Sequence, residues 1–201
     1  MTQAPTNSSL DRLDRLAFGA TAGLAKPSPG VCLVLILLAN SVAAVSLWLF
    51  GRPLLPASEF LRLWSADLGV ASNSQHLSDP YSFMHSLFGA GLFLFLDWLK
   101  PIWPLRSKLI VAVLGSVVWE IVENTPQVIR LFNESGQPGA YAGDSIVNSL
   151  SDTGFVIAGF LIGRLLGWRT TLVLAVVTEI ALSVSIGDGL LLGTLKVLGL
   201  M

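Results

Sequence analysis

The stretch WEIVENTPQVIRLFNESGQPGAYAGDSIVNSLSD, Trp119–Asp152, decides which folds the chain can adopt. Its carboxylates include Glu120, Glu123, Asp144 and Asp152, within sequence rich in valine, leucine and isoleucine. A charged side chain at the centre of a bilayer costs about 2.5–3.5 kcal/mol on insertion scales, so acids in such surroundings need a compensating partner. The stretch therefore predicts a polar centre inside an otherwise apolar bundle of helices.

The composition agrees with a membrane protein. Of the 201 residues, 53% are hydrophobic and 12% are charged, whereas soluble proteins carry about 25% charged residues. Residues 31–50 contain no charged side chain, and about 20 apolar residues are needed to cross the hydrocarbon core. We therefore predict an all-α fold, a polytopic integral membrane helical bundle surrounded by membrane lipids. The net charge of −1 gives no reason to expect a nucleic-acid partner, and a single cysteine, Cys32, cannot form a disulfide within the chain.

About five membrane spans are expected, over residues 31–50, 81–99, 109–130, 144–166 and 170–186. They follow a cytoplasmic N-terminal tail, residues 1–30, and residues 31–201 form a single transmembrane domain. Residues 59–69 suggest an interfacial helix, because Trp64 suits the headgroup region. The last twelve residues are apolar but too short to cross, so they should lie along the interface or pack back on the bundle.

Short signals predict where helices begin, bend and pack. Asp79 followed by Pro80 is typical of an N-cap and a first helical position. Pro126 has no N–H, so it should either kink the third span or lie near its end. Glycines let helices approach closely, and the second and fourth spans offer Gly89, Gly91, Gly154, Gly159 and Gly163.

Lysine and arginine predict the orientation. With five spans and the N-terminus inside, eight of the 12 basic residues fall on the cytoplasmic side. An excess of basic residues is typical of cytoplasmic segments. The N-terminus is therefore expected to be cytoplasmic and the C-terminus to lie outside.

Polar residues of different spans should meet at similar depths. At about 1.5 Å of rise per helical residue, the acids of the third and fourth spans reach the same outer half of the bundle. Asp144, Asn148 and Asp152 recur at intervals of four residues, on one face of a helix. The expected pocket comprises His85, Glu120, Glu123, Asn124, Tyr141, Asp144, Ser145, Asn148 and Asp152.

The acids of this pocket have few basic partners, which leaves two ways to compensate their charge. Either burial and mutual repulsion keep some carboxyls protonated, or a cation binds among them. The candidate metal ligands are His85, Glu120, Glu123, Asp144 and Asp152. Because most of these residues are oxygen donors, Mg²⁺, Mn²⁺ or Ca²⁺ is favoured over Zn²⁺.

The sequence leaves open whether the pocket is catalytic. It contains no P-loop, GxSxG or HExxH motif. An active site here would be that of a metal-dependent hydrolase or transferase acting on a lipid headgroup, with Glu120 or Asp152 as the base for a metal-activated water. The headgroup would then contact the polar pocket residues Asn124, Tyr141, Ser145 and Asn148.

A non-catalytic alternative accounts for the same residues. Asparagine, serine and glutamate side chains of membrane helices often form interhelical hydrogen bonds. The chain would then be a membrane scaffold or accessory protein whose polar residues fix helix packing. A homo-oligomer is compatible with either function.

Three motifs, in order, carry a resemblance to a known family: DPYSFMHSLFG (79–89), WEIVENTP (119–126) and YAGDSIVNSLSD (141–152). Together they resemble an uncharacterised family of small proteobacterial inner-membrane proteins, over about residues 60–190. More distantly, the layout is similar to the VanZ-like membrane proteins, at Asp79, His85, Glu120, Asp144, Asn148 and Gly154. Glu123 stands where the VanZ type has glutamine, and the arginine that commonly precedes the aspartate block is missing. The resemblance implies a role in the cell envelope.

Overall fold

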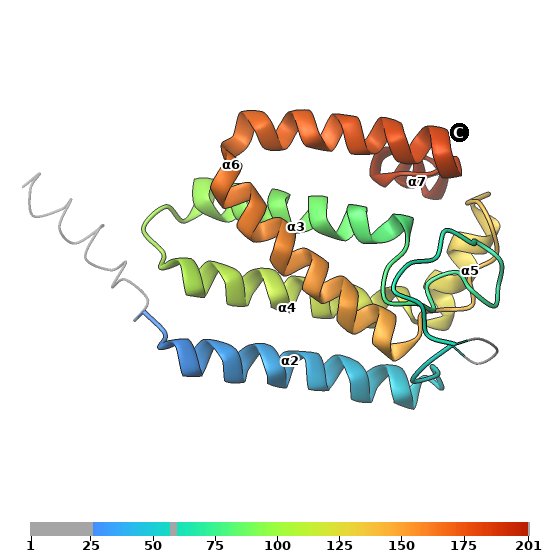
Figure 1. The fold of residues 1–201 in the computed structure, drawn as a ribbon, viewed down its shortest axis with the longest axis horizontal. Coiled ribbons are helices and arrows are strands. Elements are labelled where there is room, and N and C mark those ends of the chain that lie inside the picture. Colours follow the sequence, from blue (N-terminus) through green and yellow to red (C-terminus); the bar gives the residue numbers. More distant parts are fainter. Residues whose placement is uncertain (1–25, 57–59, 201) are drawn as a thin grey trace, which may run out of the picture.

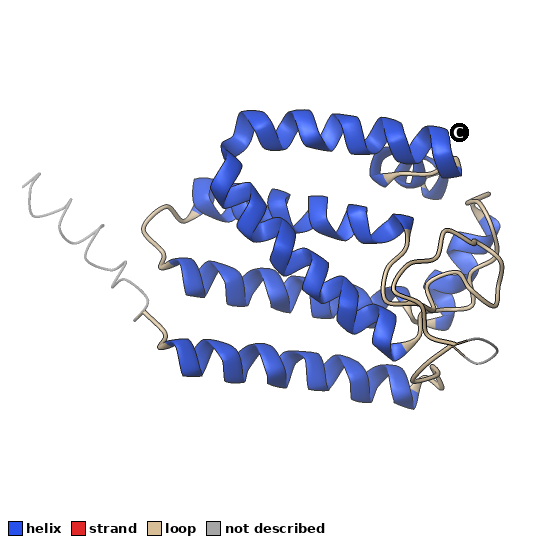
Figure 2. Ribbon diagram, in the orientation of Figure 1, coloured by secondary structure: helices blue, strands red, loops and turns tan. Residues whose placement is uncertain are grey.

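Six helices form the regular structure of the part of the chain that the computed structural model describes, residues 26–56 and 60–200 (Figures 1 and 2). In chain order they are α2 (Pro29–Leu49), α3 (Pro80–Leu99), α4 (Leu105–Glu123), α5 (Pro126–Glu134), α6 (Ile146–Ile186) and α7 (Leu190–Val197). No strand occurs in this part of the chain. The all-α prediction is therefore confirmed, whereas most of the predicted tail, residues 1–30, lies outside the described residues.

Three of the described helices, α2, α3 and α6, are long and apolar enough to cross a membrane. The chain is therefore a multi-pass membrane protein. Figure 1 shows that successive helices alternate in direction, since α3 runs opposite to α2 and α4 runs forward again. This alternation brings the start of α3, the end of α4 and the start of α6 to the same end of the bundle.

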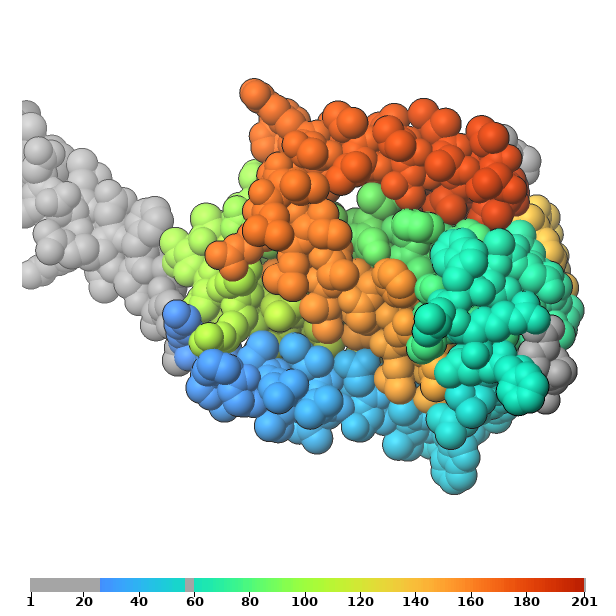
Figure 3. All heavy atoms as spheres, viewed as in Figure 1, coloured from blue at the N-terminus to red at the C-terminus, as the bar shows by residue number. Residues whose placement is uncertain are grey.

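The residues of the predicted fourth and fifth spans form the two arms of α6, which reverses direction at Gly167 (Figure 1). Gly167 has φ 72° and ψ 170°, a conformation that is essentially restricted to glycine. The second arm therefore returns toward the end at which α6 begins. Figure 3 shows this arm standing apart from the helices below it along part of its length.

The predicted third span, residues 109–130, is corrected, because the structure divides it between α4 and α5. α4 ends at Glu123, and α5 begins at Pro126 with Thr125 as its N-cap. Pro126 has no N–H for the carbonyl of Val122, which instead accepts a hydrogen bond from Thr125 Oγ1 at 2.6 Å. Of the two roles predicted for Pro126, a position at a helix end is the one observed.

Two further helix boundaries differ from the sequence prediction. The first arm of α6 begins at Ile146, so Asp144 precedes the helix instead of opening it. Ser145 is the N-cap, since its Oγ accepts a hydrogen bond from the backbone N–H of Asn148 at 3.1 Å. The expected interfacial helix around Trp64 is also corrected, because residues 60–69 form an irregular loop.

The backbones of α3 and the first arm of α6 touch at glycines. A Cβ added at Gly159 would lie 1.8 Å from the carbonyl oxygen of Ser86, and one at Gly89 would lie 2.0 Å from that of Val156. Such distances leave room for a hydrogen atom only. The predicted close approach is thus seen at Gly89, Gly159 and Gly163, whereas a Cβ at Gly91 or Gly154 would meet open space.

Apolar side chains fill the remaining contacts between the helices. Phe93 of α3 and Phe160 of α6 meet edge to face, with ring centroids 5.2 Å apart, an arrangement that aromatic pairs favour. A second cluster joins α2 to α4 through Ala39, Ala43, Val113 and Val117. These contacts fix the ends of α3, α4 and α6 relative to one another.

Glu179 binds α7 to the second arm of α6. Its carboxylate accepts hydrogen bonds from the backbone N–H groups of Leu190, Leu191 and Leu192, at 2.9–3.2 Å. A carboxylate at this position satisfies N–H groups that have no partner within the helix and complements the helix dipole. Of the two arrangements predicted for the last residues, packing back on the bundle is the one observed.

Candidate functional site

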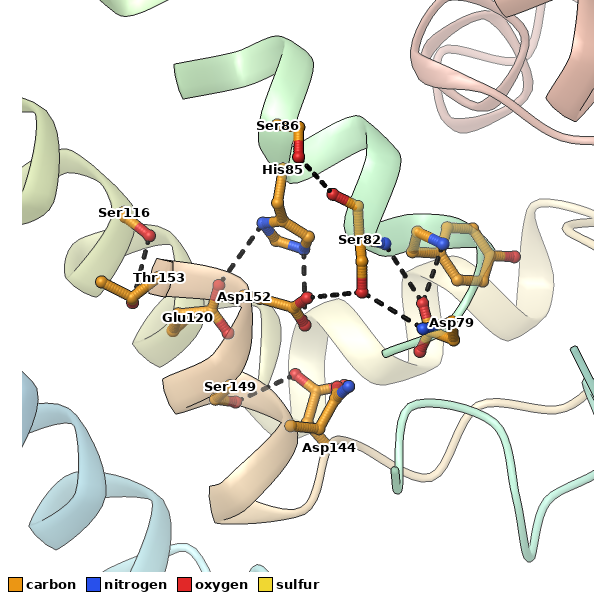
Figure 4. Close-up of polar contacts among 12 residues, drawn as sticks. Asp79, Ser82, His85, Ser86, Ser116, Glu120, Asp144, Ser149, Asp152 and Thr153 are labelled. Carbon is orange, nitrogen blue, oxygen red and sulfur yellow. Dashed lines mark hydrogen bonds and ion pairs between the residues drawn. The ribbon is translucent and has the colours of Figure 1, made fainter. Parts of the chain in front are cut away.

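Three helices bring a histidine and two acids together at one end of the bundle (Figure 4). His85 Nδ1 lies 3.6 Å from Glu120 Oε1, and His85 Nε2 lies 3.8 Å from Asp152 Oδ2. His85 comes from α3, Glu120 from α4 and Asp152 from α6. Their side chains are 11%, 0% and 4% exposed, so the imidazole lies between two carboxylates that are shielded from solvent.

The capping residues at the start of α3 reach the same group. Asp79 is the N-cap and Pro80 the first helical residue, as predicted. Ser82 closes the capping box by accepting a hydrogen bond from the backbone N–H of Asp79 at 3.2 Å. The Ser82 hydroxyl donates in turn to Asp152 Oδ1 at 3.0 Å. The first turn of α3 thereby orients the carboxylate that faces His85.

Asp144 is the centre of a second hydrogen-bond group. Its side chain accepts hydrogen bonds from Asn124 Nδ2 at 2.6 Å, from the Tyr141 hydroxyl at 2.9 Å and from Ser149 Oγ at 3.3 Å. Its backbone N–H donates to Asn124 Oδ1 at 2.8 Å. Burial, followed by the charge of Asp144, raises the pKa of Tyr141 well above its ordinary value. Tyr141 therefore stays a neutral donor.

Ser145 and Asn148 connect the start of α6 to the loop that precedes α3. The Ser145 hydroxyl donates to the carbonyl of Gln75 at 2.9 Å, and Asn148 Nδ2 donates to the carbonyl of His76 at 2.8 Å. Both side chains are almost fully buried. These two predicted pocket residues therefore hold the loop over the acids.

Three of the predicted metal ligands form a compact group. One ligand atom from each of His85, Glu120 and Glu123 lies within 4.8 Å of the other two. Glu120 and Glu123 are consecutive on one side of α4 because residues three apart share a helix face. An imidazole nitrogen and two carboxylate oxygens at this spacing have the donor types and separation that a divalent cation needs.

Several buried acceptors around this group have no hydrogen-bond donor among the described residues. They are both carboxylate oxygens of Glu120, Asp79 Oδ2, Asn73 Oδ1 and Asn148 Oδ1. A buried polar atom without a partner typically costs about 1–3 kcal/mol. Every one of these atoms accepts hydrogen bonds or cations, so the site is short of positive charge and of donors.

A cavity of about 420 Å³ opens beside the acids. Glu123, Asp144, Asp152 and Tyr141 line it, together with His85. Apolar and aromatic side chains of α3, α4 and the α7 region line it as well, namely Met84, Phe88, Trp119, Leu190, Val197 and Leu198. The lining of the cavity therefore combines acidic with apolar side chains.

The structure places the predicted site residues at two levels. His85, Glu123, Tyr141, Asp144 and Asp152 line the cavity. Glu120, Asn124, Ser145 and Asn148 lie behind them, each less than 2% exposed. Among these four residues, Asn124 supports Asp144 through the hydrogen bonds described above.

Three residues at the site had no place in the sequence prediction of the pocket. Ser82 donates to Asp152, Asp188 accepts a hydrogen bond from the Tyr81 hydroxyl at 3.4 Å, and Asn73 lines the cavity. The spacing of Ser82, three residues before His85 on the same helix face, was a signal that could have found it. Asn73 and Asp188 lie in loops, where no periodicity points to a shared face.

Asp79 should make the stability of the protein depend on pH. Burial, and then the charges of Asp152 and Asp144, raises the pKa of Asp79 from 3.8 to about 7. The folded protein therefore keeps a proton that the unfolded chain loses. The stability contribution of this proton is complete below pH 3.8 and is lost as the pH rises to about 7.

Asp79→Asn, which retains a side chain suited to an N-cap, is expected to remove this part of the pH dependence. Between pH 5 and pH 8 the free energy of unfolding of the wild type should fall by about 3 kcal/mol relative to that of the variant, at 1.36 kcal/mol per pKa unit. Thermal unfolding of both proteins in detergent across this pH range is the measurement. Parallel pH profiles for the two proteins would show that Asp79 does not titrate in this way.

Comparisons with known proteins agree with the three sequence motifs. Residues 47–201 match the family model described as "Protein of unknown function (DUF2585)". A UPF0314 protein of Sphingopyxis alaskensis is 36% identical over 163 residues, covering 81% of this chain and 86% of that protein. A UPF0314 protein of Brucella anthropi is 35% identical over 180 residues, covering 88% and 91%. One of Sinorhizobium fredii is 37% identical over 151 residues, covering 73% and 75%.

No solved structure matches the chain significantly. The relatives are matched over most of their own length, and residues 47–201, which match the family model, include the whole of the site described above. The resemblance to an uncharacterised proteobacterial family is thus confirmed, and the chain belongs to the DUF2585, or UPF0314, family.

Proposed function

We propose that this protein crosses the inner membrane five times and binds a divalent cation together with the headgroup of an envelope lipid, in an acidic cavity open to the periplasmic side. The observation that carries the proposal is Glu120. Its side chain is 0% exposed, and neither of its oxygens accepts a hydrogen bond from the described residues. One of its oxygens lies within 4.8 Å of a ligand atom of His85 and of Glu123.

The five-span arrangement is supported by the direction of the helices. α2, α3, α4 and the two arms of α6 alternate in direction (Figure 1). With a cytoplasmic N-terminus, this order puts the site at the periplasmic end. The surplus of lysine and arginine on the opposite side favours the same orientation.

A cation is supported by the imbalance of charge at the site. Among the described residues, the only ion-pair partner of Glu120 and of Asp152 is His85. Lys108, the basic side chain of α4 that is also buried, is paired with Asp97 at 2.6 Å. A divalent ion held by His85, Glu120 and Glu123, with Asp152 close by, would supply the missing positive charge. Because carboxylate oxygens dominate this set, Mg²⁺, Mn²⁺ or Ca²⁺ is favoured over Zn²⁺.

A lipid headgroup is supported by the mixed lining of the cavity. Its volume of about 420 Å³ falls in the range of small-molecule sites. Acidic side chains line it together with apolar ones such as Phe88 and Leu190. A ligand with a polar head and an apolar chain matches this combination.

The scaffold alternative is supported by one specific observation. Asn124 and Asp144 form a reciprocal hydrogen-bond pair that joins the end of α4 to the start of α6. Ser116 and Thr153 are also within hydrogen-bond distance across the same two helices, at 3.2 Å. These polar residues act as packing contacts, and on this alternative Glu120 would do the same without a cation.

Metal analysis of the purified protein separates the two functions. After purification with Mg²⁺, Mn²⁺ and Ca²⁺ present, elemental mass spectrometry should find about one divalent ion per chain. Glu120→Gln removes the central ligand charge at constant shape and should reduce bound metal at least tenfold. Glu134→Gln is the matched control, because Glu134 is exposed and lies outside the ligand group.

The outcomes of this experiment are distinct. A stoichiometric ion that is lost in Glu120→Gln and kept in Glu134→Gln supports the metal site. Wild-type protein that folds and carries no divalent ion would reject it in favour of the scaffold. Equal metal content in the wild type and Glu120→Gln would show that any bound ion lies elsewhere.

A further inference from the structure

We propose that the ligand of the cavity is an amphiphile whose headgroup carries an organic ammonium group. This inference deepens the proposed function and rests on it for the lipid nature of the ligand. It does not depend on the divalent ion, because Asn73, Asp144 and Asp188 line the cavity without belonging to the group of His85, Glu120 and Glu123.

The charge of the cavity walls is the first argument. Four carboxylates line the cavity, from Glu123, Asp144, Asp152 and Asp188. Neither lysine nor arginine occurs among the described residues that line it. A single divalent ion would leave much of this negative charge uncompensated, and it would sit at one end of the cavity. A headgroup that is only anionic would be repelled, whereas a cationic group would be attracted.

The unpartnered acceptors are the second argument. Asn73 is 4% exposed and lines the cavity, and its Oδ1 has no donor among the described residues. Its orientation is fixed, since Nδ2 of the same amide donates to the carbonyl of Ala140 at 3.3 Å. A buried acceptor without a partner is costly, and a donor group of a ligand or a water molecule removes that cost. An ammonium group with N–H bonds supplies donors and charge together.

Aromatic rings are the third argument. Tyr81, Phe88, Trp119, Phe132 and Tyr141 all line the cavity. The face of an aromatic ring attracts organic cations, and aromatic surroundings are a recurring way to bind alkylated ammonium groups. Aromatic rings alone would also suit an apolar ligand. Aromatic rings together with four carboxylates favour an organic cation.

The apolar part of the lining decides between a free amine and an amphiphile. Met84 of α3 and Leu190, Val197 and Leu198 at α7 also line the cavity. A small hydrophilic amine would leave this surface without a partner. An alkyl chain attached to the headgroup would cover it, at about 25 cal/mol for each Å² of apolar area removed from water.

A pair of single-chain lipids tests the inference directly. Lysophosphatidylethanolamine and lysophosphatidylglycerol can be matched in chain and phosphate, so that they differ only in the headgroup alcohol, of which ethanolamine carries an amine and glycerol does not. Binding to the full-length protein in a nonionic, amine-free detergent is measured by native mass spectrometry, with and without EDTA. We expect the ethanolamine lipid to bind at least tenfold more tightly in both conditions.

Asp188→Asn provides a second readout at the cavity itself. Asp188 lies outside the proposed metal ligands and is 1% exposed, and asparagine keeps the acceptor for the N–H of Gly189. The variant should reduce the discrimination between the two lipids at least threefold. Asp67→Asn is the matched control, because the exposed Asp67 accepts a similar backbone hydrogen bond from Gly69 at 2.9 Å and should leave discrimination unchanged.

Each result decides the question. Equal binding of the two lipids would overturn the inference, even where metal analysis finds the predicted ion. Preference for the ethanolamine lipid would support it, even where no metal is found. Free phosphoethanolamine that competes as strongly as the lipid would overturn the requirement for an apolar chain.

Discussion

Gly159→Ala should destabilise the protein more than any other single methyl group added to the helices. The added Cβ would lie 1.8 Å from the carbonyl oxygen of Ser86 and 2.6 Å from its carbon. Both atoms belong to the backbone of α3, so no side-chain rotation can relieve the contact and the two helices must separate. Overpacking costs about 1–3 kcal/mol when side chains can yield, and we expect about 3 kcal/mol or more here.

Gly154→Ala is the matched control on the same arm of α6. A Cβ at Gly154 meets no atom within 4 Å, so the substitution should be neutral or stabilising by up to about 1 kcal/mol through helix propensity. Thermal unfolding in detergent measures both effects. Because His85 directly precedes Ser86, separation of the helices should also weaken metal binding in Gly159→Ala. Equal stability of the two variants would contradict the backbone contact between α3 and α6.

Asn124→Leu is expected to lower the free energy of unfolding by about 3–5 kcal/mol, the range for removing one partner of a buried charged pair. The Asn124 side chain donates to Asp144 Oδ2 and accepts from the Asp144 backbone N–H. It also donates to the carbonyl of Glu120 at 3.0 Å. Leucine has a similar size but leaves a carboxylate oxygen and an N–H of Asp144 without these partners, where Asp144 is 1% exposed.

Asn133→Leu tests the same geometry in contact with solvent. The Asn133 side chain forms a reciprocal pair with the backbone of Tyr141, at 2.8 and 3.0 Å, but it is exposed. Because water can replace the lost hydrogen bonds, the free energy of unfolding of this variant should fall by only about 1 kcal/mol. Chemical or thermal unfolding of the two variants gives the comparison. A small loss of stability in Asn124→Leu would show that water replaces the lost partners of Asp144 in the folded protein.

Helical periodicity carried most of what the sequence could predict about the site. Glu120 and Asp152 lie on helices with a regular rise, so their depths could be compared by counting residues from the helix ends. The structure brings both of them within 4 Å of His85. The start of α3 was also predictable, because an aspartate followed by proline is typical of an N-cap and the first helical position.

The parts of the site that lie in loops were not predictable in this way. The backbone path of residues 72–76 depends on contacts with Ala140 and Gly143, almost 70 residues away in sequence. No local pattern encodes such pairs. The helix break before Pro126 was ambiguous for a related reason, since a proline fixes where one hydrogen bond is lost but not whether the chain continues as a helix.

The position of α7 has a consequence for how the protein matures during synthesis. This segment follows every other part of the site in chain order, yet Leu190 and Val197 complete a wall of the cavity. The reversal at Gly167 and the attachment to Glu179 must both form before that wall is in place. While α7 is still within the ribosome, an acid-lined recess is therefore open, and the cavity takes its final form only after α7 has emerged and packed against α6.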